Sequence, residues 1–144
     1  MAKTLYISDL DGTLLNRQSR LSKFTIDNLN HLLNKGVLFT FATARSWHSA
    51  HVVTEGLCSS LPWIVHNGAF TVDGTTGKPS HQVFFRKEES EFILQLADEL
   101  GLWPLVYAII NGREQVLYCP NAHMHAGTKY YISSRQGDPR LLAV

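Results

Sequence analysis

Strand-like and helical segments alternate through the first 68 residues, and this alternation is the feature that most constrains the fold. Short segments rich in β-branched and aromatic residues, at 4–8, 37–43 and 61–68, are predicted strands. Residues 22–36 and 46–56 lie between them and have the signals of helices. This order predicts an α/β fold with a parallel sheet, whose strands are buried because both faces are covered.

The pattern changes after the third predicted strand. Residues 69–85 contain two strand-like runs around a turn region, which predicts a hairpin. Residues 86–101 predict a helix, and we expect its apolar stripe of Phe92, Leu96 and Leu100 to be part of a core. Asn111-Gly112, between two apolar runs, predicts a second hairpin. We therefore expect a parallel α/β unit followed by an α+β unit, with the boundary between residues 81 and 82.

Polar residues and glycines follow each predicted strand where it ends. Because the carboxyl ends of parallel strands meet at one edge, we expect these residues to lie together. Carboxylates favour a hard cation such as Mg²⁺, and a hydroxyl with backbone N–H groups at a helix start favours phosphate. The sequence therefore predicts a metal and phosphate site formed by Asp9, Leu10, Asp11, Gly12 and Thr13 after the first strand, Thr43, Ala44 and Arg45 after the second, and Asn67 and Gly68 after the third.

Each part of this site also has a plainer explanation. An isolated Asp-x-Asp-Gly sequence is more often a surface turn than a site, and Thr43 alone would be an ordinary helix cap. Arg45 could pair with a surface carboxylate as readily as with a substrate, and Asn67-Gly68 could be only a turn. The strand context and the order of the three segments favour a common site over these separate explanations.

Composition and charge exclude several classes of protein. Thirteen basic and twelve acidic residues give a net charge of +1, which offers no electrostatic basis for binding nucleic acid. Cys58 and Cys119 match no metal or redox spacing, so we expect two reduced thiols. No apolar run approaches membrane-spanning length, and the N-terminal residues do not have the pattern of a signal peptide. We expect a cytoplasmic protein.

Three segments of the chain resemble motifs of one enzyme superfamily. DLDGTLL, FTFATAR and IVHNGA, in this order and each after a predicted strand, resemble the haloacid dehalogenase (HAD) superfamily, in particular its Cof-like, type IIB sugar phosphatases. The second motif departs from the usual A-T-G-R, since Ala44 replaces the glycine. The resemblance extends from residue 3 to about residue 120. It implies a Rossmann-like HAD core at residues 1–81 and the start of an α+β cap domain at residues 82–144.

The resemblance also implies a reaction and the residues that perform it. It implies a Mg²⁺-dependent phosphoric monoester hydrolase acting on small phosphorylated metabolites such as sugar phosphates. Asp9 would be the nucleophile that forms an aspartyl-phosphate and a ligand of Mg²⁺. Asp11 would be the general acid and base, with its backbone carbonyl as a second metal ligand. Phosphate or substrate would be bound by Leu10, Gly12, Thr13, Thr43, Ala44, Arg45, Asn67 and Gly68.

Two elements of the family pattern are missing from the chain. The pattern requires a lysine that stabilises the phosphorylated aspartate and a late Gly-Asp…Asp motif that completes the metal site, both after the cap. Lys129 and Gly137-Asp138 lie in the expected cap region, and no strand precedes Gly137-Asp138, so neither is a convincing substitute. We therefore expect the chain to be the N-terminal part of a longer phosphatase, with an unfinished sheet edge.

Two other functions remain open. The chain could be a non-catalytic fragment or pseudo-enzyme that binds a partner, or a second copy of itself, through the unfinished sheet edge. It could also be a nucleotide-sugar transferase that uses Asp-x-Asp only to hold a metal. The transferase would need a nucleotide-binding region before the motif, and only eight residues precede Asp9, which counts against it.

Overall fold

The computed structural model describes residues 4–120 and 124–144. The chain divides into two compact units, with the boundary between Phe84 and Phe85. We call the part up to Phe84 the first unit and Phe85–Val144 the second unit. The predicted boundary lies between residues 81 and 82. The assignment of the two units to a core and a cap domain stays a prediction.

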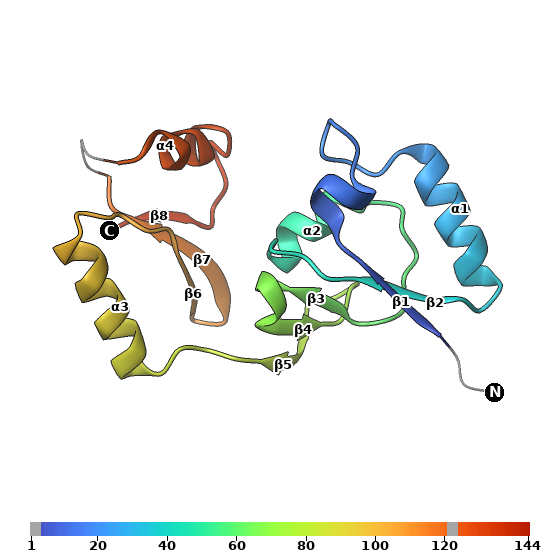
Figure 1. The fold of residues 1–144 in the computed structure, drawn as a ribbon, viewed down its shortest axis with the longest axis horizontal. Coiled ribbons are helices and arrows are strands. Elements are labelled where there is room, and N and C mark those ends of the chain that lie inside the picture. The colour runs from blue at the N-terminus through green and yellow to red at the C-terminus, as the bar shows by residue number, and fades with distance from the viewer. Residues whose placement is uncertain (1–3, 121–123) are drawn as a thin grey trace. The chain divides into compact units, whose positions relative to one another are not determined.

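The first unit contains the predicted alternation of strands and helices. Strands β1 (Leu5–Ser8) and β2 (Leu38–Phe41) are parallel neighbours, joined through helix α1 (Lys23–Asn34) (Figure 1). Helix α2 (Trp47–Val53) then leads to strand β3 (Trp63–Val65). A single parallel bridge between Ala42 and Ile64 connects the end of β2 to β3. The three strands therefore run in one direction, and their carboxyl ends lie at one edge.

A hairpin completes the first unit. Strands β4 (Phe70–Val72) and β5 (Pro79–Gln82) form a three-stranded sheet with β3, in which neighbouring strands are antiparallel. The hairpin predicted from residues 69–85 is confirmed. β3 belongs to this sheet, and within the described residues its backbone pairs with the end of β2 through the bridge alone, so the three parallel strands do not form one continuous ladder.

Local signals determine where the first helices begin and end. The Ser22 hydroxyl caps α1 by accepting a hydrogen bond from the backbone N–H of Thr25 at 3.0 Å, at the start of the helix predicted from residues 22–36. Gly36 follows α1 with φ of +83°, a conformation that favours glycine. The Ser46 hydroxyl caps α2 in the same way, by accepting from the N–H of Ser49 at 3.3 Å. These boundaries confirm the helices predicted in the first unit.

The core of the first unit lies beneath the loops that end its strands. Its fully buried side chains include Leu10 from the loop after β1, Phe41 at the end of β2 and Val65 at the end of β3. The rings of Phe41 and Trp63 pack with centroids 4.7 Å apart. Because these core residues come from the strand ends, burial fixes the positions of the loops that follow them.

Strand β1 differs from the prediction of a buried strand. Leu5, Tyr6 and Ile7 are 48%, 56% and 51% exposed, respectively. Successive side chains of a strand point to opposite faces, so both faces of β1 are open. Among the described residues, β1 pairs with β2 alone, so it lies at the edge of a two-stranded sheet with little packed over either face. The apolar composition correctly predicted a strand, but burial also requires neighbours that the described residues do not supply.

The second unit contains helix α3 (Lys87–Glu99) and a sheet in the order β6 (Val106–Ile110), β7 (Arg113–Tyr118) and β8 (Leu141–Ala143). Ile110 pairs with Arg113, so the loop is the predicted Asn111-Gly112 turn, with φ of +51° and +73°. Helix α4 (Ala126–Ser133) and the parallel pairing of β8 with β7 were not predicted. The sequence there has too weak a periodicity to indicate either element.

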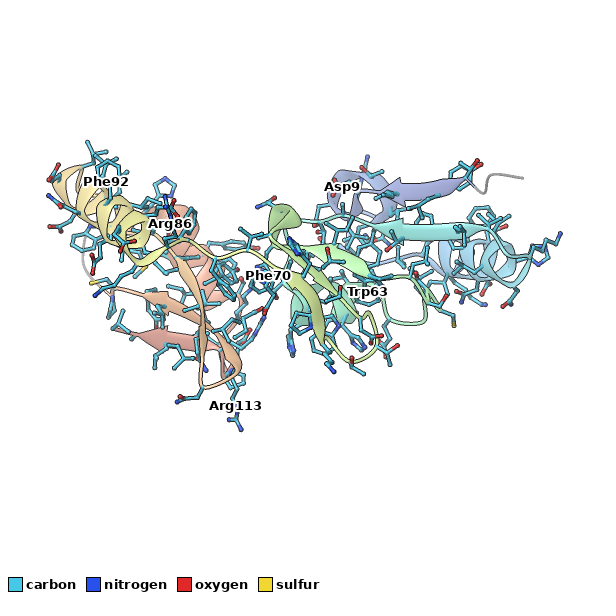
Figure 2. All side chains as sticks on the ribbon, turned by 90° about the horizontal axis from the view of Figure 1, so that it is seen from below. Asp9, Trp63, Phe70, Arg86, Phe92 and Arg113 are labelled. Atoms are coloured by element: carbon cyan, nitrogen blue, oxygen red, sulfur yellow. The ribbon has the colours of Figure 1, made fainter. Side chains whose placement is uncertain are left out.

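The apolar stripe of α3 is not part of a core in this chain, contrary to the prediction. Phe92, Leu96 and Leu100 are 65%, 43% and 62% exposed, and no residue of α3 is buried (Figure 2). Helical spacing correctly predicted a helix with an apolar face. Burial of that face depends on a packing partner, which the described residues do not provide.

Cys58 and Cys119 are reduced cysteines, as predicted. In residues 4–120 and 124–144, the structure has no helical segment with the length and hydrophobicity that a bilayer crossing requires.

Candidate active site

The loop after β1 presents Asp9 and Asp11 on either side of a buried residue. Leu10 is fully buried in the core, whereas both aspartates are exposed (Figure 2 labels Asp9). The Leu10 carbonyl accepts a hydrogen bond from the N–H of Leu15 at 2.9 Å, which closes the loop. Gly12 allows the turn because its φ is +75°. Burial of Leu10 therefore turns the two carboxylates outward at the carboxyl end of β1.

The Asp11 carboxylate forms a two-point ion pair with Arg45. The Arg45 Nε and Nη2 atoms each donate to one Asp11 carboxylate oxygen at 2.7 Å. The Arg45 Nη1 atom donates to the Ser49 hydroxyl on α2 at 3.0 Å. The hydrogen bonds from Arg45 lower the pKa of Asp11, and its charge adds to this effect against the opposing effect of desolvation. Arg45 thus pairs with a carboxylate, one of the two alternatives left open, and that carboxylate is itself a predicted site residue.

Thr43 is almost completely buried at the end of β2. Its N–H donates to the carbonyl of Ile64 at 2.9 Å, which links the loop after β2 to β3. Its hydroxyl oxygen accepts from the N–H of Arg45 at 3.2 Å. Within the part of the chain that the structure describes, no acceptor is assigned to the Thr43 hydroxyl proton. The hydroxyl can therefore donate to a ligand oxygen while it still caps the loop.

The loop after β3 has an unusual backbone. His66, Asn67 and Gly68 have φ of +51°, +55° and +92°, in the left-handed region that non-glycine residues rarely adopt. The N–H of His66 donates to the carbonyl of Arg45 at 2.9 Å, and the N–H of Asn67 donates to the carbonyl of Thr43 at 3.0 Å. These hydrogen bonds hold the strained loop against the loop that follows β2.

The three loops enclose an open pocket of about 480 Å³. The predicted site residues that line it are Asp9, Asp11, Thr43, Ala44, Asn67 and Gly68. Ala42 and Ile64 also line it but were not predicted as site residues. They are brought there by the bridge between β2 and β3, which pairs distant residues and leaves no signal in the sequence. The structure therefore brings together residues that are up to 59 positions apart, 9 and 68, at one edge.

Four predicted site residues do not line the pocket. Leu10 is buried, so only its backbone could contact a ligand. Gly12 and Thr13 lie in the same loop as the aspartates, outside the lining. Arg45 bonds to Asp11, which does line the pocket.

The residues at the pocket offer two oxygen donors that suit a hard cation, the Asp9 carboxylate and the Asp11 backbone carbonyl. Among the described residues, no hydrogen bond to the Asp9 carboxylate is assigned, so its oxygens are available. The described residues contain no cluster of three His, Cys, Asp or Glu side chains placed to bind a metal. The donor set fits Mg²⁺ in kind but is small, so water would fill most of an octahedral shell.

Comparison with known proteins identifies the family. The sequence pattern that defines haloacid dehalogenase-like hydrolases matches residues 6–140. The chain belongs to the haloacid dehalogenase-like hydrolase family. The superfamily and the HAD-like α/β fold predicted from the three motifs are both confirmed.

Curated relatives match about half of this haloacid dehalogenase-like hydrolase. The HMP-PP phosphatase of Yersinia pestis is 34% identical over 89 residues, which are 60% of this chain and 32% of the relative. A glucosyl-3-phosphoglycerate/mannosyl-3-phosphoglycerate phosphatase of Persephonella marina is 34% identical over 62 residues, which are 43% of this chain and 23% of the relative. The chain therefore spans a third or less of these two relatives.

Solved structures share the fold over nearly the whole chain. A HAD phosphatase from Bacteroides thetaiotaomicron is 22% identical with a TM-score of 0.70, covering 99% of this chain and 49% of that protein. A HAD subclass IIB sugar phosphatase is 19% identical with a TM-score of 0.69, covering 99% of this chain and 53% of that protein. This haloacid dehalogenase-like hydrolase thus spans about half the length of these structures.

The structure also bears on the two substitutes considered for the missing motifs. Asp138 lies in the second unit, where Arg140 donates to its two carboxylate oxygens at 3.0 and 2.6 Å. It follows no strand directly, as its sequence context indicated, and it precedes β8, which was not predicted. Lys129 lies in α4 of the same unit. Neither residue belongs to the first unit, which contains the pocket.

Proposed function

We propose that the chain carries the nucleophile-bearing part of a Mg²⁺-dependent phosphatase that hydrolyses small phosphorylated metabolites, sugar phosphates in particular. The observation that carries this proposal is the pocket in which Asp9, Asp11 and Thr43 meet at the carboxyl ends of three parallel strands. Family membership supports it, as do the phosphatase names of relatives that match the chain in part.

The proposed reaction has two steps. In the first, an Asp9 carboxylate oxygen forms a bond to phosphorus while the bond to the leaving oxygen breaks. Asp11, after it has left Arg45 and taken up a proton, gives that proton to the leaving oxygen. In the second, Asp11 takes a proton from water as the water oxygen attacks phosphorus and the bond to Asp9 breaks. The products are the alcohol, inorganic phosphate and the two regenerated aspartates.

The neutral groups of the pocket would bind the phosphoryl oxygens. The Thr43 hydroxyl can donate to one oxygen, and backbone N–H groups near Leu10, Gly12 and Ala44 can donate to others. Magnesium bound by Asp9 and the Asp11 carbonyl would offset negative charge on the phosphoryl group. The side chain of Asn67 and the backbone of Gly68 lie where they could contact the rest of the substrate.

Trapping of the phosphorylated protein tests this proposal. The chain is incubated with labelled acetyl phosphate and Mg²⁺, quenched in acid and digested, and the labelled peptide is identified by mass spectrometry. We expect hydroxylamine-sensitive label on Asp9, since an aspartyl-phosphate is an acyl phosphate. Asp9→Asn should abolish the label, and Asp11→Asn should retain it. Label that persists in Asp9→Asn would rule out Asp9 as the nucleophile.

A second candidate function, self-association through the unfinished sheet edge, is favoured by the exposure of β1. The strand is uncharged, contains no proline, and exposes Leu5, Tyr6 and Ile7. Natural proteins usually protect such edges with charges or proline, because unprotected edges pair with other strands. Two copies could pair their β1 strands antiparallel.

Light scattering coupled to size-exclusion chromatography tests self-association. We expect the wild-type chain to form a dimer and Tyr6→Lys to be monomeric. The matched control is Phe24→Lys, because Phe24 is 77% exposed on α1 of the same unit but lies outside β1. A wild-type monomer at all concentrations, or equal loss of the dimer in both variants, would exclude pairing through β1.

A further inference from the structure

The pocket is unfavourable to an anion in the arrangement that the structure shows. Asp9 and Asp11 both line it, and none of the lining residues, all in the described part of the chain, has a positive charge. A phosphate monoester would therefore approach two carboxylates without a cationic partner. Apart from any metal ion, the protein itself therefore has to supply a cation for such a ligand to bind well.

Arg45 can supply this cation, because its guanidinium group contacts a lining residue, Asp11. Two of its nitrogen atoms, Nε and Nη2, are bonded to the two Asp11 oxygens at 2.7 Å. Guanidinium groups bind carboxylates and phosphates in the same two-point geometry. The Asp11 carboxylate thus takes the position at Arg45 that two phosphate oxygens would take.

The two partners differ in how firmly they are held. The Arg45 side chain is only 19% exposed, and its remaining terminal nitrogen donates to the Ser49 hydroxyl of α2. Its backbone carbonyl accepts from the N–H of His66. The Asp11 side chain is 51% exposed and lies next to Gly12 in a loop. Arg45 can therefore stay in place while Asp11 rotates away.

We infer that Arg45 is the phosphate-binding cation of this pocket and that Asp11 is its placeholder, which an incoming phosphoryl group displaces. The inference rests on the proposed function, since it assumes that the pocket takes phosphate. The exchange releases the Asp11 carboxylate from Arg45 when the phosphoryl group arrives. The residue proposed to transfer protons thus becomes free to move toward the leaving oxygen only in the occupied pocket.

A double-mutant cycle on phosphate binding tests the exchange. Inorganic phosphate is titrated into the full chain in the presence of EDTA, at constant pH and ionic strength, and followed by two-dimensional ¹H–¹⁵N NMR. We expect Asp11→Asn to tighten binding about tenfold or more, because phosphate no longer competes for the guanidinium. Arg45→Met should weaken binding. In the Arg45→Met background, Asp11→Asn should tighten phosphate binding less, by only the factor expected from removing one negative charge.

Asp9→Asn is the matched control for that charge effect. It removes one negative charge from the same pocket, and the structure assigns no bond between Asp9 and Arg45. Asp9→Asn should therefore tighten phosphate binding by the same factor in the wild-type and in the Arg45→Met background. If the gain from Asp11→Asn is also equal in the two backgrounds, the placeholder role is wrong.

A second variant keeps the test valid if Arg45→Met does not fold. Arg45→Lys keeps the charge but loses the two-point geometry, so phosphate should bind more weakly than to wild type. In the Arg45→Lys background, Asp11→Asn should also increase the phosphate affinity by a smaller factor. Phosphate binding to Arg45→Lys that equals wild type would also overturn the inference.

The trapping experiment separates this inference from the proposed phosphatase. Label on Asp9 without coupling between Asp11 and Arg45 would refute the exchange alone. Coupling without label on Asp9 would refute the phosphatase reaction, while Arg45 would remain the anion-binding residue.

Discussion

Substitution of Gly74 should destabilise the first unit, because this glycine lies directly against a buried indole ring. A Cβ atom at position 74 would lie 2.4 Å from both Cε2 and Nε1 of Trp63 and 2.9 Å from its Cδ1. Trp63 is 4% exposed and packs against Phe41, so its ring cannot easily move aside. Non-bonded carbon atoms prefer separations of about 3.5–4.0 Å, so the turn between β4 and β5 would have to shift.

The expected cost of Gly74→Ala has two parts. Overpacking of a rigid site costs about 1–3 kcal/mol. The Gly74 carbonyl also accepts a hydrogen bond from Trp47 Nε1 at 3.0 Å, and a shift of the turn would weaken it at a cost of about 1 kcal/mol. We therefore expect Gly74→Ala to lower the free energy of unfolding of the first unit by about 2–4 kcal/mol.

Urea denaturation followed by circular dichroism measures this cost, and a second substitution tests its cause. Trp63→Phe shortens the ring that the new methyl group would meet, so Gly74→Ala should cost less in that background. We expect a coupling of about 1 kcal/mol or more between the two substitutions. A cost of Gly74→Ala below about 0.5 kcal/mol, or strictly additive costs, would show that the turn yields without strain and refute the reasoning.

Three further predictions concern the pocket. The pKa of Asp11 is lowered in the folded state, so its contribution to stability is complete above the unfolded pKa near 3.8 and is lost as the pH falls through the folded pKa. The side chain is half exposed, so solvent screening limits this contribution to about 1 kcal/mol or less. Urea denaturation at neutral and acid pH should show the loss in wild type and not in Arg45→Met, and equal pH dependence would contradict it. Calorimetry should detect only weak Mg²⁺ binding, abolished by Asp9→Asn, and tight binding unaffected by that change would exclude Asp9 as a ligand. In a chain that turns over, Asp11→Asn should reduce the rate about 10²–10⁴-fold for esters with poor leaving groups and less for good ones, since only poor leaving groups need a proton. Equal losses for both would leave Asp11 a structural carboxylate.

Local signals in the sequence predicted the elements of the first unit well. Ser22 and Gly36 bound α1 because capping and left-handed φ depend on one residue and its nearest neighbours. The Asn111-Gly112 turn was predictable for the same reason. The site edge was also predictable, because parallel strands place the residues that follow them at one edge whatever the details of packing.

Contacts between distant residues could not be read from the sequence. Whether Leu5 and Phe92 are buried depends on what packs against β1 and α3, and an apolar residue type does not specify that. From the sequence, Arg45 could pair equally well with a carboxylate or with a substrate, because its partner, Asp11, lies 34 positions away. The β8 strand was missed because its pairing with β7 depends on an intervening helix with weak periodicity.

The strained loop after β3 depends on the loop after β2, to which it is hydrogen-bonded. Left-handed φ at a non-glycine residue such as His66 or Asn67 costs on the order of 1–3 kcal/mol. The two hydrogen bonds that link this loop to the backbone at positions 43 and 45 contribute about 1 kcal/mol each, so they offset the strain only in part. The loop therefore keeps its conformation only while the loop after β2 is in place. The loop after β2 also carries Arg45. A change that breaks the hydrogen bond between the His66 N–H and the Arg45 carbonyl should therefore displace both Arg45 and Asn67.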